Sequence, residues 1–341
     1  MPEDPVQTQD RERVHLPAST LGEYRQFSLY NSPYPAHDAG CAVDLYPSSN
    51  GGLSPVAGEV VETRTVRAPA KPYADDEEYL VLIDVDAARS GIARGGPGGP
   101  GGRAPDGLVA RILHVRPSVA AGDTVAVGDP LGEMVRSGFF APWVANHVHL
   151  GFRRAGQNLH RAVGSLPVVA GVTVDPVPWD GTGTVVETGD TYALLDAPVH
   201  PGDGFAGIAA VVGRDGDASG GGTAGGDPAG GAACRVALDG GFAHYAGGGV
   251  LWPGRERGGD RDAPPQGVVS LLNHPIGDLR GRTVTWRDVD VLANDARITG
   301  LSLFAGNEDV GAKLVCPETA LDVGEEVRVR IRDSDDPIRL G

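Results

Sequence analysis

Two histidines separated by one residue, His147 and His149, form the pattern in this sequence with the clearest chemical meaning. On a β-strand, residues i and i+2 point to the same face and lie about 6–7 Å apart. At that spacing one imidazole can bind a metal ion while the other faces whatever the metal holds. Taken alone, the pair fits two histidines on a solvated strand face better than a metal site. The choice between these interpretations therefore depends on the surrounding sequence.

Three more residues could contribute to such a site: His37, Asp44 and His114. Asp44 lies inside an apolar run, where a carboxylate is costly unless it is paired or metal-bound. It could instead cap a turn or pair with an arginine. His114 ends another apolar run, and a core histidine with satisfied hydrogen bonds would also explain it.

The order of these residues resembles the M23 metallopeptidases of the lysostaphin type, over residues 31–155. That family has a histidine with a Gly-x-Asp segment, a Pro-Val-x-Ala-x-x-Gly-x-Val hairpin, an aromatic-x-His, a Gly-x-x-Val-x-x-Gly turn and a terminal His-x-His. The corresponding parts here, in the same order, are His37 with Gly40–Asp44, Pro55–Val61, Ile112–His114, Gly122–Gly132 and His147–His149. The resemblance implies a core of antiparallel strands with barrel-sandwich-like hairpins.

The resemblance also implies a role for each residue. His37, Asp44 and His149 would bind Zn²⁺ and leave its fourth position to water, as in catalytic zinc sites. His114 and His147 would be the catalytic pair, one taking a proton from that water and the other stabilising the oxyanion. The implied activity is hydrolysis of a peptide amide bond, with a peptide or protein as substrate and Zn²⁺ as cofactor.

The spacing leaves the first ligand open. His37 lies seven residues before Asp44, whereas the family usually has four, so a loop insertion must return its imidazole to the metal. Cys41, three residues before Asp44, could replace it as a thiolate, and Asp38 as a carboxylate. A cysteine there is otherwise a small buried hydrophobe. The alternative function is a non-catalytic β scaffold that binds a peptide or a partner protein.

The composition predicts an all-β chain. Of 341 residues, 52 are Gly and 27 are Pro, which break helices, and no apolar pattern at i, i+3, i+4 and i+7 is sustained. Short Val/Leu/Ile-rich runs bounded by Gly, Pro and Asp are typical of strands and turns. The expected parts are a flexible arm over 1–25, an M23-like domain over 26–167 with a loop insertion at 88–107, and a C-terminal β domain over 168–341 with glycine-rich loops at 213–233 and 253–267.

The charge balance excludes some partners. The chain has 45 acidic and 29 basic residues, a net charge of −16, and only two lysines. It lacks the cationic excess that nucleic acids and anionic membranes attract. No apolar run is long enough to span a membrane and no export signal is visible, so we expect a cytoplasmic protein. The acidic, lysine-poor composition suggests a halophilic host, and the acidic run Asp75–Glu78 is interpreted as a solvated turn.

Overall fold

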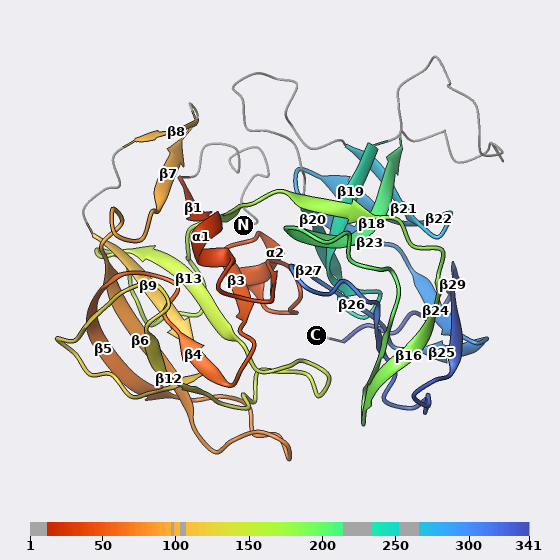
Figure 1. Ribbon diagram of the computed structural model, residues 1–341, viewed down its shortest axis with the longest axis horizontal. Helices are drawn as coiled ribbons and strands as arrows, with labels where there is room; N and C mark the ends of the chain where they lie inside the picture. The colour runs from red at the N-terminus through yellow and green to blue at the C-terminus, as the bar shows by residue number, and fades with distance from the viewer. Residues whose placement is uncertain (1–11, 97–98, 103–106, 214–233, 252–265, 341) are drawn as a thin grey trace. The chain divides into compact units, whose positions relative to one another are not determined.

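The computed structural model describes residues 12–96, 99–102, 107–213, 234–251 and 266–340. Within them the chain consists mainly of β-strands, with two helices of four residues each (Figure 1). The predicted all-β class is therefore confirmed. Most of the predicted glycine-rich loops at 213–233 and 253–267 lies outside the described residues. In the part that is described, no helix is long and apolar enough to cross a membrane.

The chain divides into two compact units. The first takes in the described residues up to Leu29 and Tyr34–Val172, and the second takes in Tyr30–Pro33 and the described residues from Thr173 onward. The domain boundary predicted at 167/168 falls before strand β14 (Val168–Gly171). Because β14 pairs in parallel with β1 (Arg13–Pro17), it belongs to the first unit.

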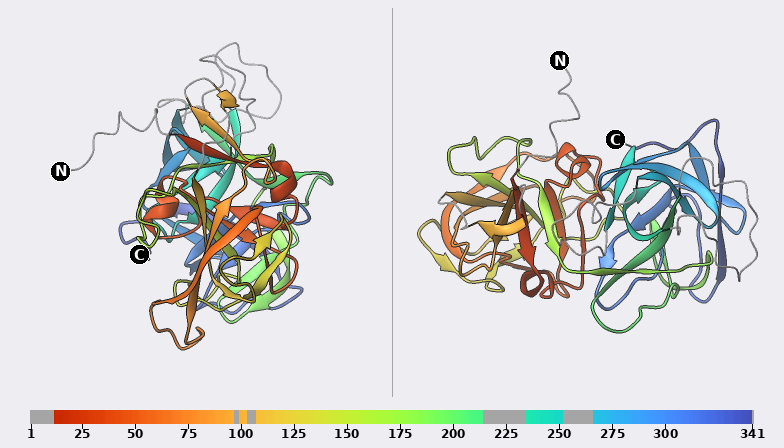
Figure 2. Two further views of the ribbon diagram at one scale, coloured as in Figure 1. Left: turned by 90° about the vertical axis from the view of Figure 1, so that its left-hand side faces the viewer. Right: turned by 90° about the horizontal axis from the view of Figure 1, so that it is seen from above.

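A sheet of antiparallel strands forms the centre of the first unit (Figures 1 and 2). It has seven strands. Every neighbouring pair in it is antiparallel. In sheet order the strands are β11 (Thr124–Val125), β5 (Gly58–Val66), β6 (Glu78–Val85), β9 (Leu108–Leu113), β13 (Val148–Arg154), β3 (Ala42–Tyr46) and β2 (Gln26–Ser28). All five residues of β3 are buried, which encloses the polar Asp44 within an otherwise apolar strand.

Two smaller sheets complete the first unit. One contains β14, β1, β7 (Ala93–Gly96) and β8 (Gly99–Gly102), and the other contains β10 (Val115–Pro117), β12 (Pro130–Met134) and β4 (Gly51–Leu53). The paired strands β7 and β8 form a hairpin within the loop insertion predicted at 88–107.

The flexible arm predicted over 1–25 is wrong from residue 13 onward. Strand β1 and helix α1 (Ala18–Leu21) form there instead. Their apolar side chains Val14, Leu16 and Leu21 are fully buried, so this segment is part of the core of the first unit. The alternation of buried and partly exposed residues along β1 is the pattern of a half-buried strand.

Six strands of the second unit close into an antiparallel barrel, because each pairs with two neighbours around a ring. Around the ring they are β18 (Phe205–Gly213), β19 (Cys234–Phe242), β20 (Gly247–Leu251), β23 (Thr283–Trp286), β22 (His274–Arg280) and β21 (Gly267–Leu271). The other strands of this unit are β15 (Val174–Val177), β16 (Thr182–Gly189), β17 (Tyr192–Leu195), β24 (Val289–Ala293), β25 (Ala296–Ile298), β26 (Gly300–Leu303), β27 (Ala305–Gly306), β28 (Lys313–Val315) and β29 (Glu326–Asp333). One hydrophobic cluster, including Phe242 and Trp286, fills this unit.

His244 is a fully buried titratable residue of the second unit. Gly241 and Gly300 lie so close that a Cβ at either position would approach a ring nitrogen of His244 to 2.6 or 2.7 Å. Burial lowers the pKa of His244 from 6.5 to about 3, although a hydrogen bond with the backbone of Phe242 opposes this. The imidazole is therefore neutral in the folded protein near pH 7.

We expect the second unit to lose stability as the pH falls below 6.5. The unfolded chain takes up a proton at His244 near pH 6.5, whereas the folded chain takes it up only near pH 3, so protons favour the unfolded state in between. The slope approaches about 1.4 kcal/mol of unfolding free energy for each pH unit. This slope can be measured by hydrogen exchange in β19 from about pH 7 to about pH 5, after correction for the intrinsic exchange rates.

The matched comparison for this experiment uses two histidines of the same unit. His244→Phe should flatten the pH dependence, because the titrating group is gone. His274→Gln should not, because the imidazole of His274 is partly exposed and pairs with the exposed Asp333. An equal slope in the parent and in His244→Phe would contradict the prediction.

Candidate metal centre

Asp44 and His149 face each other on neighbouring strands of the first unit. The antiparallel register of β3 and β13 places them directly opposite one another. Such residues share one face of the sheet, with Cβ atoms about 4.5–5.5 Å apart. Asp44 Oδ1 lies 2.8 Å from Nδ1 of His149. His147 precedes β13 by one residue, and its Nε2 lies 3.3 Å from the same Asp44 oxygen.

Helix α2 (Pro35–Asp38) brings His37 to this pair. The helix begins with a proline, whose fixed φ suits the first helical position. His37 Nδ1 lies 2.9 Å from the carbonyl oxygen of Leu29, to which it donates its proton. Its Nε2 is then directed to 3.3 Å from Nδ1 of His149 and 3.5 Å from Oδ1 of Asp44. Metal-binding histidines are commonly oriented by such a bond from the other ring nitrogen.

The three atoms form a triangle with sides of 2.8, 3.3 and 3.5 Å. A tetrahedral zinc ion with ligands at about 2.0–2.1 Å places its ligand atoms about 3.3 Å apart. Two imidazole nitrogens and one carboxylate oxygen are also a donor set that zinc accepts. His37, Asp44 and His149 are the group that could hold a metal ion within the described part of the chain. The residues present therefore fit a zinc ion.

The charge state of these groups suits a metal. Burial alone would raise the pKa of Asp44, but the charges of His147 and His37 and hydrogen bonds from His147 and His149 hold it well below its ordinary value of 3.8. Burial lowers the pKa of His149 to about 4, against the effect of Asp44. An ionised carboxylate and an unprotonated imidazole are the forms that bind metal ions.

His147 is held between two aromatic rings. The ring centroids of Phe140 and Tyr46 lie 4.3 and 4.9 Å from that of the imidazole. Its Nδ1 lies 3.0 Å from the carbonyl oxygen of Ala145, to which it donates. These contacts fix the ring with Nε2 towards Asp44.

His114 reaches the site through an uncommon backbone conformation. It follows β9, whose last residue, Leu113, pairs with His149 and shares its face. In an extended chain His114 would therefore point to the opposite face. Its φ is instead +72°, a region that residues other than glycine rarely adopt. The imidazole lies with its centroid 5.2 Å from that of His147 and 5.7 Å from that of His149.

Glu78 is a functional candidate that the sequence analysis missed. Its side chain is buried, and Oε2 lies 2.9 Å from Nδ1 of His114. The interpretation of Asp75–Glu78 as a solvated turn is wrong for this residue, because β6 begins at Glu78. Strand alternation could have identified Glu78. Leu80 pairs with Leu113, which lies on the face of His149. Glu78, two residues before Leu80 on the same strand, therefore points to that face as well.

The pKa values of Glu78 and His114 reflect their contact. Burial would raise the pKa of Glu78, but hydrogen bonds from His114 and Ser137 and the charge of His114 lower it below 4.5. Burial lowers the pKa of His114 below 6.5, and Glu78 opposes this. Near pH 7 the pair is thus a carboxylate beside a neutral imidazole.

All five residues singled out from the sequence, His37, Asp44, His114, His147 and His149, come together here. The two alternative first ligands do not join them. Asp38 is exposed, and the Cys41 thiol lies 3.9 Å from the carbonyl oxygen of Ala39. Neither is a member of the group that could hold a metal.

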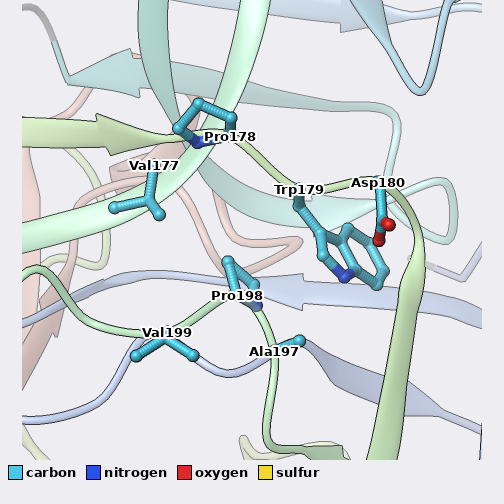
Figure 3. Close-up of a pocket in the computed structure, with 7 residues that line it drawn as sticks. All are labelled: Val177, Pro178, Trp179, Asp180, Ala197, Pro198 and Val199. Atoms are coloured by element: carbon cyan, nitrogen blue, oxygen red, sulfur yellow. The ribbon is translucent and has the colours of Figure 1, made fainter.

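A hollow in the second unit, about 440 Å³ in volume, offers no comparable chemistry (Figure 3). Asp180 is the ionisable residue among those that line it, and its Oδ1 accepts hydrogen bonds from the backbone N–H and the hydroxyl of Thr182 at 2.9 and 2.6 Å. The lining residues are Val177, Pro178, Trp179, Asp180, Ala197, Pro198 and Val199.

The fold and the site together define a two-unit, all-β protein with a buried His/Asp cluster that could hold a metal ion. Residues 15–170 match the family model of the N-terminal domain of the domain of unknown function DUF8155, and residues 175–332 match that of its C-terminal domain. The two models together span most of the chain, which therefore belongs to the DUF8155 family.

Two further comparisons add little. No curated protein matches the sequence. Among solved structures, "A Novel M23 Metalloprotease Pseudoalterin from Deep-sea" is similar at 14% identity and a TM-score of 0.25, over 45% of this chain and 77% of that one. A likeness at that score carries no weight for fold or function.

Proposed function

We propose that this chain is a zinc-dependent hydrolase that cleaves a peptide amide bond by means of a metal-activated water. The observation that supports this best is the triangle of His37 Nε2, Asp44 Oδ1 and His149 Nδ1 with two further imidazoles beside it. Structural zinc sites are closed by four protein ligands, whereas catalytic ones have three and an open position. Among the described residues this group has three members.

We assign proton transfer and charge stabilisation to two histidines beside the three ligands. A zinc ion held by the three ligands would act as a Lewis acid and bring the pKa of a water to about 7. His114 presents Nδ1 to Glu78, which leaves Nε2 as the nitrogen that can accept a proton. His147 has Nδ1 on the Ala145 carbonyl oxygen and Nε2 towards Asp44. In the protonated imidazole both ring nitrogens are donors, and in that form His147 would stabilise charge that develops on the substrate's carbonyl oxygen. The substrate would be a peptide or protein.

Metal content is the experiment that tests this proposal. We expect about one zinc per chain by elemental mass spectrometry after purification at high salt without chelator or histidine tag, as a three-ligand site requires. His149→Ala should lose it, because the variant lacks one corner of the triangle. The matched control is His160→Ala, which removes an exposed histidine of the same unit.

The outcomes separate the two candidate functions. Zinc in the parent and in His160→Ala but not in His149→Ala would support the site, and a peptide library screened by mass spectrometry would then test hydrolysis. No zinc in any protein, even after zinc is added back, would contradict the proposal. The better account would then be a metal-free β scaffold that binds a peptide or partner protein.

A further inference from the structure

The carboxylate of Glu78 receives four hydrogen bonds from groups around it. Oε1 accepts the backbone N–H of Tyr79 at 2.8 Å and that of His114 at 3.0 Å. Oε2 accepts Nδ1–H of His114 at 2.9 Å and a short hydrogen bond from the Ser137 hydroxyl. With its side chain 1% exposed, this carboxylate has little contact with water, and its partners set its orientation.

Two of these bonds go to the same residue, one to its backbone and one to its side chain. The backbone bond supports His114 at its positive φ, and a second bond, from the N–H of Val135 to the His114 carbonyl at 2.9 Å, supports it from the other side. The side-chain bond fixes the rotation of the imidazole about the Cβ–Cγ bond of His114. Glu78 thus holds His114 in a conformation that the preceding strand would not give it.

The side-chain bond also determines which ring nitrogen carries the proton. An ionised carboxylate can only accept, so Nδ1 of His114 must be the protonated nitrogen. In a neutral imidazole the other nitrogen, Nε2, then has a free lone pair. The Ala145 carbonyl likewise makes Nδ1 of His147 a donor, but this partner carries no charge.

We propose that Glu78 is the positioning residue of this site: it fixes the orientation and the tautomer of His114 so that Nε2 can accept a proton during hydrolysis. The part that concerns hydrolysis rests on the proposed function, whereas the part that concerns His114 can be measured without any substrate. Neither part assigns Glu78 a contact with the metal or the substrate.

Glu78→Gln is the discriminating variant, because it keeps the shape of the side chain and replaces one acceptor oxygen by a donor NH₂. The amide oxygen can still accept the two backbone N–H groups, which leaves the NH₂ facing Nδ1 of His114. Nδ1 must then become the acceptor, and the proton moves to Nε2. The matched control is Glu77→Gln, the same change at the neighbouring, exposed carboxylate.

The primary measurement is the tautomer of His114 by ¹⁵N NMR of protein labelled at histidine, with the signal assigned by its loss in His114→Gln. The parent and Glu77→Gln should show a protonated Nδ1 and an unprotonated Nε2, and Glu78→Gln the reverse. Zinc content should be the same in all three. If the parent hydrolyses a peptide, Glu78→Gln should lower kcat about 10³–10⁴-fold with KM little changed, since a catalytic histidine in the wrong tautomer has an effect of this size.

The outcomes separate this inference from the proposed function. A parent protein with the proton on Nε2 would overturn the inference without any variant, even if Glu78→Gln fails to fold. An unchanged tautomer or an unchanged kcat in folded Glu78→Gln would also overturn it. A tautomer that moves as expected, in a parent that binds zinc but cleaves no peptide, would support the positioning of His114 and contradict the proposed hydrolysis.

Discussion

Replacing Asp44 by alanine is expected to abolish zinc binding. Asp44 Oδ1 lies within 3.5 Å of Nε2 of His37, Nδ1 of His149 and Nε2 of His147, so the variant removes both a proposed ligand and the one negative charge among these imidazoles. Removing a residue that only hydrogen-bonds a metal ligand lowers metal affinity by about 10–100-fold. The loss of Asp44 should lower zinc affinity by more than that. Zinc per chain, measured after dialysis against a weak chelator, should fall from about one to near zero.

Asp38→Ala is the control for this prediction. Asp38 is exposed, lies next to His37 in the sequence, and was an alternative ligand in the sequence analysis. The Asp38→Ala variant should therefore contain as much zinc per chain as the parent protein. Zinc retained in Asp44→Ala would show that the carboxylate is not a ligand, and zinc lost in Asp38→Ala would show that the wrong carboxylate has been assigned.

Replacing His147 by alanine is expected to leave zinc in place and remove hydrolysis. Its Nε2 approaches Asp44 Oδ1 to 3.3 Å, but His147 is outside the group of three that could hold the metal. The loss of a side chain that transfers a proton or stabilises charge in the transition state costs about 10²–10⁴-fold in rate. The readout is cleavage of the best peptide from the library screen, beside zinc content.

His147→Ala also removes side-chain volume, because His147 fills the space between the rings of Phe140 and Tyr46. A second variant is needed to distinguish loss of packing from loss of the imidazole. His147→Gln retains more of that volume and should lose activity to a similar extent. His160→Ala, at the surface, should lose none. Cleavage by His147→Ala at the rate of the parent would rule out a catalytic role for this histidine.

Strand alternation made part of the site predictable. An apolar run around Asp44 and a His-x-His pair both indicate strands, and antiparallel pairing of two such strands places Asp44 opposite His149. The composition was enough for the all-β class, because helix-breaking residues and short β-branched runs occur throughout the chain. The closed barrel of the second unit was not predictable, since it depends on pairing between strands far apart in sequence.

The rest of the site depends on features that a residue pattern does not contain. A one-turn helix and a hydrogen bond to the carbonyl oxygen of Leu29 bring His37 to the candidate metal site. The spacing alone had left His37 and Cys41 as alternatives. His114 needs a positive φ, which the extended pattern of the preceding strand does not predict. Glu78 was hidden within an acidic run, because a carboxylate next to other acidic residues is usually solvated.

The buried pair of carboxylates, Asp44 and Glu78, determines how the centre interacts electrostatically with approaching molecules. Their two negative charges equal in size the charge of one divalent cation, and the neighbouring His114 and His149 are neutral near pH 7. A bound divalent cation would therefore leave these four groups with little net charge, within a chain whose net charge is −16. Long-range steering therefore comes from the rest of the protein: it speeds the encounter with cations and basic peptides, slows that with acidic ones, and weakens as salt rises.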